Sequence, residues 1–396
     1  MKFIMVLLGA TALLCASPSR AQQTVKIGMV EAYTGTMAIF SLSAEEGLRL
    51  YMQQKGDTVA GKKIQFVKGD ASRLDAFAVS RLSRLLVQNG ADILMGYDFL
   101  RNAFAAAAVS ADEKKFMVSM DRQASMITTR SPYVVRSAFT SWQINRSFGG
   151  WAFRSGVRKL YTLVVDSDRG TQAESAFQDG FTSAGGRIVG IDRYPPSTSD
   201  FTHFLQRAKE TNPDGIFIWA GDDEPLFAFF DIIVRQPTDL ARNADIIKAV
   251  ASSGIDATKI KIMSHAMLTN DYVIKTAGDN ALGVITAFNY NCYSDSQNKK
   301  IFAEAFSAAF GHSPDADAVA RYDGMHLIYE ALKRTNGNTD AAALTDAVRG
   351  LKWESPCGQL MIDPETRDVA QTVHIRRVQK VNGALTNVEF DKVESN

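Results

Sequence analysis

The chain of 396 residues contains only 3 cysteines and 10 prolines, and its formal net charge is +1 at pH 7. A balance so near zero creates no field that would attract nucleic acid or an anionic membrane. After the amino-terminal segment, no apolar run approaches the about 20 residues that cross a bilayer. We therefore expect no nucleic-acid partner and no membrane channel. The spacing of Cys292 and Cys357 leaves open whether they pair in an oxidising compartment.

Signatures of catalysis and of metal binding are missing as well. The sequence has no G-x-S-x-G elbow, no Walker A loop, no H-E-x-x-H and no C-x-x-C. Its 5 histidines stand at no metal-ligand spacing. The acidic run Asp222-Asp223-Glu224-Pro225 fits a helix cap better than a metal site, because negative charge suits the first turn of a helix. We expect no catalytic residue, no metal and no cofactor.

The amino-terminal segment has the pattern of a signal peptide. Met1-Lys2 gives a positive start, Phe3 to Leu14 is apolar, and Ser19-Arg20-Ala21 places small residues at the −3 and −1 positions of a cleavage site. Cys15 follows the bulky Leu14, where a lipidation signal has a small residue. We predict that residues 1–21 are removed and that the mature protein is a soluble periplasmic protein.

Short apolar runs alternate with amphipathic stretches along most of the chain. The first pair is a buried strand expected at Val25 to Val30 and a helix expected at Ile39 to Gln54. The alternation restarts after Trp142, and it predicts right-handed βαβ units. We predict an α/β fold with two doubly wound parallel-sheet lobes. The stretch from Gln236 to Ser253 is expected to be an inserted loop with one short helix.

The tail has a different period. Val373 to Val381 and Leu385 to Val393 alternate roughly every second residue, and Asn382-Gly383 lies between them. An Asn-Gly pair between two such runs is the strongest short-range hairpin signal. We predict an antiparallel hairpin.

Aromatic residues stand in or near the loops that follow predicted strands. Tyr33 and Phe40 follow the first strand, and Tyr97 and Phe99 follow the third. Open α/β sheets bind ligands at the carboxyl ends of their strands, where helix N termini also offer N–H groups to a carboxylate. The aromatic content favours a cleft for a flat organic ligand.

Together these features resemble the periplasmic solute-binding proteins of ABC importers, specifically the leucine/isoleucine/valine-binding type with the type I periplasmic binding fold. The resemblance is carried by Ile27 to Gly35, Gly61 to Ile64, Arg321 to Met325 and Leu351 to Pro356. The run from Met361 to Asp368 is similar to the branch that includes binders of aromatic acids such as hydroxycinnamates.

This resemblance implies two lobes joined by three crossovers, which we place near Phe139, Asn289 and Thr372. Lobe one would consist of residues 22–139 plus 289–372, and lobe two of residues 140–288 plus 373–396. A small solute would bind in the interlobe cleft of a monomer, and the closed form would dock on an inner-membrane ABC permease.

The resemblance also implies the ligand-binding residues, with no catalytic residue among them. They are Tyr33, Met37, Phe40, Tyr97, Phe99, Arg101, Asn102, Asp121, Gln123, Arg169, Asp222 and His265. Two departures from amino-acid binders stand out. The loop at 97–102 is bulkier and poorer in hydroxyls, and 264–267 lacks the acid that pairs with an α-amino group. An ammonium needs a buried partner, for which Asp121 and Asp222 remain open.

The leading hypothesis is an extracytoplasmic binding component that captures a small organic solute, an aromatic or other carboxylic acid, by hinge closure. Arg169, Arg101 or His265 would hold the acid group, and the aromatic residues would enclose the apolar body. The alternatives are a branched-chain amino acid or amide binder, a ligand-sensing subunit of a membrane receptor, and an exported enzyme, since catalytic triads assemble in space.

Overall fold

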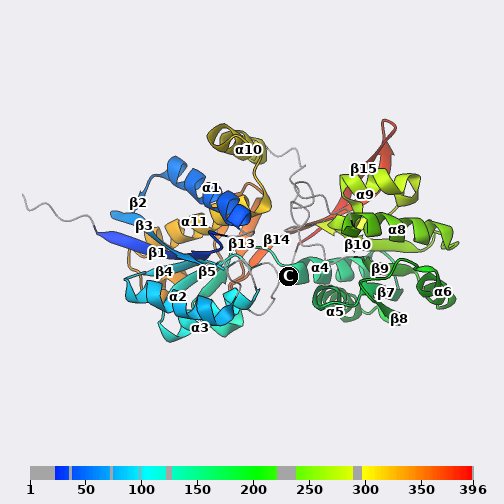
Figure 1. Cartoon of the computed structure of the whole chain (residues 1–396), viewed down its shortest axis with the longest axis horizontal. Helices are drawn as coiled ribbons and strands as arrows, with labels where there is room; N and C mark the ends of the chain where they lie inside the picture. Colours follow the sequence, from blue (N-terminus) through cyan, green and yellow to red (C-terminus); the bar gives the residue numbers. More distant parts are fainter. Residues whose placement is uncertain are drawn as a thin grey trace, which may run out of the picture.

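The computed structural model describes residues 23–34, 38–71, 75–97, 100–121, 127–220, 238–288 and 297–394. Its elements form two lobes, each with a sheet covered by helices (Figure 1). The predicted α/β architecture of two doubly wound lobes is therefore confirmed. In the described part of the chain, no helix is long and apolar enough to cross a membrane.

Lobe one is built on a six-stranded sheet in the order β2-β3-β1-β4-β5-β6. Every neighbouring pair is parallel except β2 with β3. Its strands are β1 (Thr24–Glu31), β2 (Thr58–Val59), β3 (Lys62–Asp70), β4 (Ile93–Gly96), β5 (Phe116–Ser119) and β6 (Val134–Arg136). Its helical elements are α1 (Ala38–Lys55), α2 (Ala76–Gln88), α3 (Leu100–Asp112), η1 (Ile127–Arg130), α10 (Gln297–Phe310), α11 (Ala316–Arg334) and α12 (Ala341–Val348).

Both faces of this sheet are buried, which explains why β1 is an almost continuous apolar run. Ile27 and Met29 belong to a core cluster that also contains Leu48 of α1 and Leu327 of α11. Val30 belongs to a separate cluster beneath α2 and α3. Because successive side chains of a strand point to opposite faces, one short strand supplies both cores.

Lobe two is built on parallel strands with an antiparallel edge, in the order β14-β11-β10-β9-β7-β8, and β15 also pairs with β14. Its strands are β7 (Lys159–Val165), β8 (Arg187–Tyr194), β9 (Gly215–Trp219), β10 (Lys261–His265), β11 (Ile285–Phe288), β14 (Val369–Val381) and β15 (Ala384–Glu394). Its helical elements are α4 (Ser141–Arg154), α5 (Asp168–Ser183), α6 (Thr202–Glu210), α8 (Thr238–Ser252), η2 (Ala266–Thr269), α9 (Asp271–Ala277) and η3 (Gly278–Ala281).

The stretch expected to be an inserted loop is different in the structure. From residue 238 it forms the 15-residue helix α8, so the prediction of a loop with one short helix was wrong. The reason is burial: Ala244, Ile247 and Val250 recur at intervals of three residues and are buried in the core of lobe two. Residues 221–237, which include Gln236 and Pro237 at the start of the predicted loop, lie outside the described residues.

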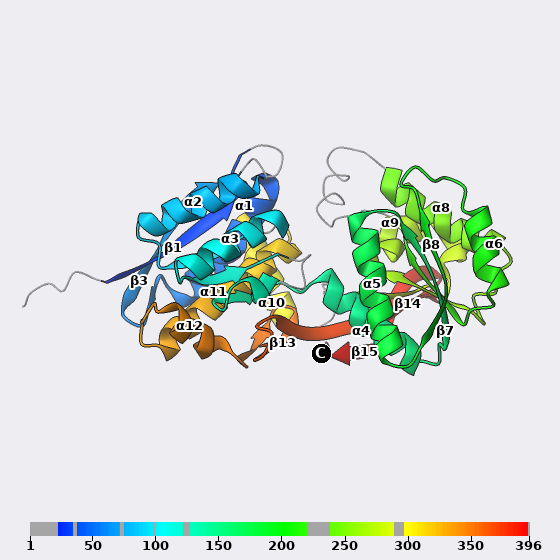
Figure 2. The ribbon, with the colours of Figure 1, turned by 90° about the horizontal axis from the view of Figure 1, so that it is seen from below.

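The 13-residue strand β14 contributes to both lobes. Its first residues, 369–371, pair with β13 (Gly358–Ile362), which forms a hairpin with β12 (Lys352–Ser355). Residues 374–377 pair with β11 of lobe two. Figure 2 shows this strand running from one lobe into the other.

The predicted tail hairpin is confirmed as β14 and β15, with Val381 opposite Ala384. Asn382 and Gly383 have φ values of 50° and 81°. A two-residue turn of this kind requires positive φ at both positions, which Asn and Gly adopt at low cost.

Candidate functional site

Three neighbouring parallel strands of lobe two end in large side chains. β9 ends at Trp219, β10 at His265 and β11 at Phe288. The ring centroids of Trp219 and His265 are 5.0 Å apart, and those of His265 and Phe288 are 6.1 Å apart in an edge-to-face arrangement. The carboxyl edge of this sheet, where open α/β sheets bind ligands, therefore carries a cluster of three rings.

Arg376 of β14 adds a positive charge to this ring cluster. Its guanidinium carbon lies 5.3 Å from the centroid of the Phe288 ring. In the antiparallel β11–β14 pair, Arg376 stands opposite Thr286, so Phe288 is its diagonal neighbour. A cation over a ring face is attracted by the ring quadrupole, and this contact orients Arg376 towards the aromatic cluster.

His265 is held in its neutral form. Burial, assisted by the charge of Arg376, lowers the pKa of His265 to about 4. Its Nδ1 accepts a hydrogen bond from the backbone N–H of Met267, at 3.4 Å. The proton of the neutral ring therefore resides on Nε2. At neutral pH His265 can donate a hydrogen bond to a ligand but brings no charge, so its predicted part in holding an acid group is that of a neutral donor.

The buried carboxylates at the carboxyl edge of lobe one are paired with arginines. Glu31, the last residue of β1, forms an ion pair with Arg321 of α11, and both side chains are almost completely buried. Gly96, the last residue of β4, has a φ of +115°, and a Cβ there would lie 2.3 Å from Glu31 Oε1. A glycine at the end of β4 therefore leaves room for the Glu31 carboxylate.

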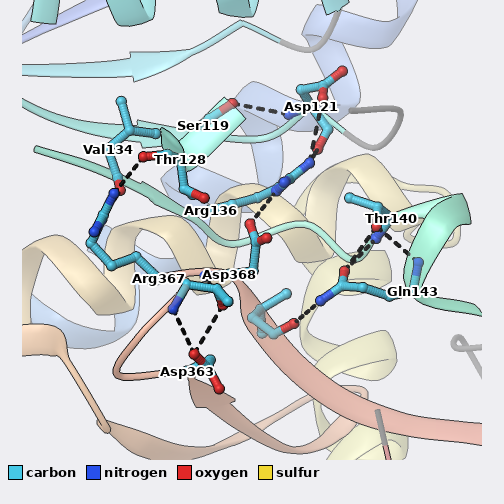
Figure 3. A network of polar contacts seen from close by, with 12 residues as sticks. Ser119, Asp121, Thr128, Val134, Arg136, Thr140, Gln143, Asp363, Arg367 and Asp368 are labelled. Atoms are coloured by element: carbon cyan, nitrogen blue, oxygen red, sulfur yellow. Dashed lines mark hydrogen bonds and ion pairs between the residues drawn. The ribbon is translucent and has the colours of Figure 1, made fainter. Parts of the chain in front are cut away.

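Asp121, one of the predicted ligand residues, lies in a second buried network (Figure 3). Arg136 Nη1 is 3.5 Å from Asp121 Oδ2, and Arg136 Nε donates to Asp368 Oδ1 at 2.7 Å. The backbone N–H of Arg136 also donates to the carbonyl of Arg367 at 3.1 Å. The network thus joins the loop after β5 to β6 and to the segment that enters β14.

A capping box continues this connection between the segments. Thr140, the N-cap of α4, accepts from the backbone N–H of Gln143, whose side chain accepts from the backbone N–H of Thr140. Gln143 Nε2 donates to the carbonyl of Val369 at 2.9 Å (Figure 3). The start of α4 and the start of β14 are therefore bonded to each other where the chain passes between lobes.

Tyr97 occupies a core position. Its side chain is fully buried in the cluster beneath α2 and α3, and its hydroxyl lies 3.0 Å from Ser83 Oγ. Burial raises the pKa of Tyr97 above its ordinary value, and the bond to Ser83 opposes that shift. In this conformation the ring packs against the sheet.

The other predicted residues of the described part lie at helix and strand ends. Tyr33 is half-buried, its backbone N–H donates to Asp70 Oδ1 at 2.9 Å, and Lys68 Nζ lies 5.1 Å from its ring centroid. In the first turn of α3, Arg101 is exposed and Asn102 is buried. Arg169 is half-buried in the first turn of α5.

Several predicted residues cannot be placed. Those that lie outside the described residues are Met37, Phe99, Gln123 and Asp222. Phe40 belongs to α1, but its side chain is outside the description. Cys292, whose pairing with Cys357 the sequence leaves open, also lies outside the described residues.

Sequence reasoning did not single out Trp219, Phe288 or Arg376. A usable signal was present for the first of them, because Trp219 ends the short apolar run Gly215 to Trp219, which forms β9. The signal for Arg376 was weak, since the contact depends on the register of β14 against β11.

Comparison with known families matches residues 24–384 to the periplasmic binding protein family. This chain belongs to that family. The family is extracytoplasmic, and its members are binding proteins rather than enzymes. The Leu/Ile/Val-binding protein homolog 6 of Brucella suis biovar 1 is 33% identical over 385 residues, which cover 96% of this chain and 94% of the relative.

Two solved structures of Rhodopseudomonas palustris proteins are also similar. The solute binding protein of an ABC transporter from strain BisB5, in complex with 3,4-dihydroxybenzoic acid, is 36% identical with a TM-score of 0.69. The one from strain HaA2, in complex with p-hydroxybenzoic acid, is 31% identical with a TM-score of 0.71. Each comparison covers 94% of this chain and 98% of the other.

Proposed function

We propose that this protein is the solute-binding component of an ABC importer and that its ligand is an aromatic carboxylic acid of the hydroxybenzoate class. The observation that carries the proposal is the similarity, over 94% of the chain, to ABC solute-binding proteins that hold hydroxylated benzoic acids. The ligand binds between the lobes, which close on it by a hinge motion, and the closed form docks on the membrane permease.

The ring cluster of lobe two suits a flat aromatic body. Trp219, His265 and Phe288 offer ring faces and edges at the end of the sheet, next to a positive charge on Arg376. Aromatic pairs in offset or edge-to-face geometry contribute about 0.5–1.5 kcal/mol beyond burial of their area. A small acid needs only a few such contacts for a micromolar dissociation constant, about −8 kcal/mol.

The charge pairing in lobe one disfavours an α-amino acid. The carboxylates of Glu31 and Asp121 are already paired with Arg321 and Arg136 inside the lobe. An α-ammonium entering this region would have to compete with a buried arginine for either of them. The relatives named Leu/Ile/Val-binding homologs favour a branched-chain amino acid as the second candidate.

Further parts of the proposal concern organisation. We propose cleavage of residues 1–21, lobes formed by 22–139 plus 289–372 and by 140–288 plus 373–396, and a monomeric state. The six-stranded sheet lies within residues 22–139, and the nine-stranded sheet joins β12 and β13 of the proposed first lobe to the strands of the second through β14. Asn289, near the middle crossover, lies outside the described residues.

A thermal-shift and calorimetry screen tests the ligand class. Mature protein, refolded to remove carried-over solute, is compared with 4-hydroxybenzoate, 3,4-dihydroxybenzoate, benzoate, a hydroxycinnamate, leucine and valine. Ligand at 100 times its dissociation constant adds about 2.7 kcal/mol, which raises the melting temperature by several degrees. We expect shifts with the aromatic acids alone. A shift with leucine or valine and none with the aromatic acids would replace the proposal by its alternative.

A further inference from the structure

Among the residues that the structure describes, the indole N–H of Trp219 is a buried donor without a hydrogen-bond partner. The residue is 8% exposed, and in the described part of the structure its Nε1 has no hydrogen-bond partner. Leaving a buried donor unsatisfied loses its hydration without a compensating bond, so such atoms are rare in folded proteins and require an explanation. Its backbone carbonyl, in contrast, accepts from the Tyr194 hydroxyl at 3.0 Å, so the strand end itself is fixed.

His265 supplies a second donor beside it. The two rings are 5.0 Å apart at the ends of adjacent strands, and His265 uses Nδ1 as an acceptor for the Met267 N–H. Its Nε2 therefore carries the hydrogen of the neutral ring. Depression of the His265 pKa to about 4, caused by burial and by Arg376, keeps it in this state at physiological pH.

The charge around these two donors comes from β14 and β15. Arg376 lies over Phe288, which in turn contacts His265. Glu389 stands opposite Arg376 in the β14–β15 register and lies 3.1 Å from His374 Nδ1. The Phe288 ring therefore lies between the Arg376 guanidinium and the His265 ring.

We propose that Trp219 and His265 form a carboxylate subsite in lobe two, in which the Nε1–H of Trp219 and the Nε2–H of His265 bind the acid group of the ligand while Arg376 stabilises its charge. This inference rests on the proposed function and adds an orientation to it: the acid end of the ligand belongs to lobe two. Two neutral donors suit an anion there, because a buried anion needs hydrogen bonds as well as a nearby cation.

The test compares an acid with its neutral analogue in matched variants. Trp219→Phe keeps an aromatic ring and removes only the N–H, and Arg376→Gln removes the charge. Arg377→Gln is the matched control, because Arg377 is the next residue of the same strand and lies over Phe390 instead, 4.3 Å from that ring's centroid. Calorimetry gives the dissociation constants for 4-hydroxybenzoate and for 4-hydroxybenzamide, and circular dichroism checks that each variant is folded.

A hydrogen bond to a charged group is worth about 1.5–3 kcal/mol, which is about 10- to 150-fold in affinity. We expect Trp219→Phe and Arg376→Gln to weaken binding of the acid by at least about 10-fold and binding of the amide much less. The dissociation constants of Arg377→Gln should stay within about twofold of those of the unaltered protein. Equal losses for acid and amide, or no loss, would overturn the subsite and leave the proposed function standing. If the unaltered protein binds no aromatic acid, both are overturned.

An indole resonance provides a second readout that does not depend on affinity differences. In a nitrogen-15 spectrum, the signal of the Trp219 N–H is identified by its absence in Trp219→Phe. Saturation with 4-hydroxybenzoate should move this signal downfield, as expected for a donor that gains an anionic acceptor. An unmoved Trp219 signal in a saturated sample contradicts the proposal.

Discussion

Arg136 and Asp368 are 232 residues apart in the sequence, yet Arg136 Nε donates to Asp368 Oδ1 at 2.7 Å inside the protein. The same guanidinium also faces Asp121. One buried cation therefore holds together the loop after β5, the strand β6 and the entry to β14. The segments leaving lobe one are fixed to each other by charge as well as by backbone bonds.

Removing the guanidinium of Arg136 should lower the free energy of unfolding substantially. Arg136→Met leaves two buried carboxylates without their partner, and the loss of one member of a buried pair typically costs about 3–5 kcal/mol. Guanidinium unfolding measures the effect. Arg146→Met is the control, because its pair with Asp179 has side-chain exposures of 41% and 45% and such pairs contribute at most about 1 kcal/mol. Similar losses in both variants would contradict the assigned importance of Arg136.

A methyl group on Gly96 should disturb the Glu31–Arg321 pair. In Gly96→Ala the new Cβ would lie 2.3 Å from Glu31 Oε1, at a backbone φ of +115°. We expect the free energy of unfolding to fall by about 2 kcal/mol or more, because the added methyl group causes both a clash and backbone strain. Gly283→Ala is the control, since Gly283 has a φ of +83° and nothing within 4 Å of the added atom. An equal loss in the two variants would mean that strain alone is responsible.

Tyr97→Phe separates packing from ligand binding. The change removes the bond between the Tyr97 hydroxyl and Ser83 Oγ and keeps the buried ring. We expect a loss of about 1 kcal/mol in unfolding free energy and no change in ligand affinity. Ser83→Ala should give a similar loss in stability, since it breaks the same bond. A clear drop in ligand affinity in Tyr97→Phe would instead support the predicted contact between Tyr97 and the ligand.

Asp323 should make stability depend on pH. Burial raises the pKa of Asp323 to about 7, against hydrogen bonds from Trp353 Nε1 at 2.9 Å and Ser355 Oγ at 2.7 Å. Between the ordinary pKa near 4 and this raised value, the folded protein holds a proton that the unfolded chain has lost. The stabilising contribution of Asp323 to the free energy of unfolding is therefore fully present below about pH 4 and is lost as the pH rises to about 7.

Asp323→Asn removes this titration. Relative to the unaltered protein, the variant should gain stability between about pH 4 and 7, with a slope of at most about 1.4 kcal/mol per pH unit, and the difference should be constant above pH 7. Guanidinium unfolding at pH 5, 6, 7 and 8 measures it. His265, whose pKa is lowered to about 4, acts with the opposite sign over part of this range, so only the difference between the two proteins is informative. A difference that does not vary with pH would contradict the prediction.

Most of the fold could be predicted from the sequence, because its strands and helices have local sequence signals. The apolar run of β1 and the Asn-Gly turn before β15 depend on near neighbours, and the structure confirmed the lobes and the hairpin that they predicted. The helix α8 was missed because the turn-like Gln236-Pro237 pair obscured an apolar face at intervals of three residues. At this point a signal for a turn lies directly before a signal for a helix.

The candidate site was harder to predict, because its contacts cross the chain. Arg376 reaches the aromatic cluster only through the pairing of β14 with β11, and Arg136 meets Asp368 across most of the sequence. His265 was named from the family resemblance, but its neutral state depends on burial and on a charge that is distant in sequence. Tyr97 was named for a loop position, whereas its ring lies in the core.

The strand β14 also constrains how the polypeptide can fold during synthesis. Its pairing partner β11 is made first, and then the ribosome produces α10, α11 and α12, which pack on α1 or its neighbours in lobe one. Only afterwards does β14 emerge to cover the open side of β11. Until that moment the second sheet exposes an unpaired edge, which is a site for wrong association. Lobe two, although nearly complete in sequence, must therefore wait for the remainder of lobe one before its own sheet can close.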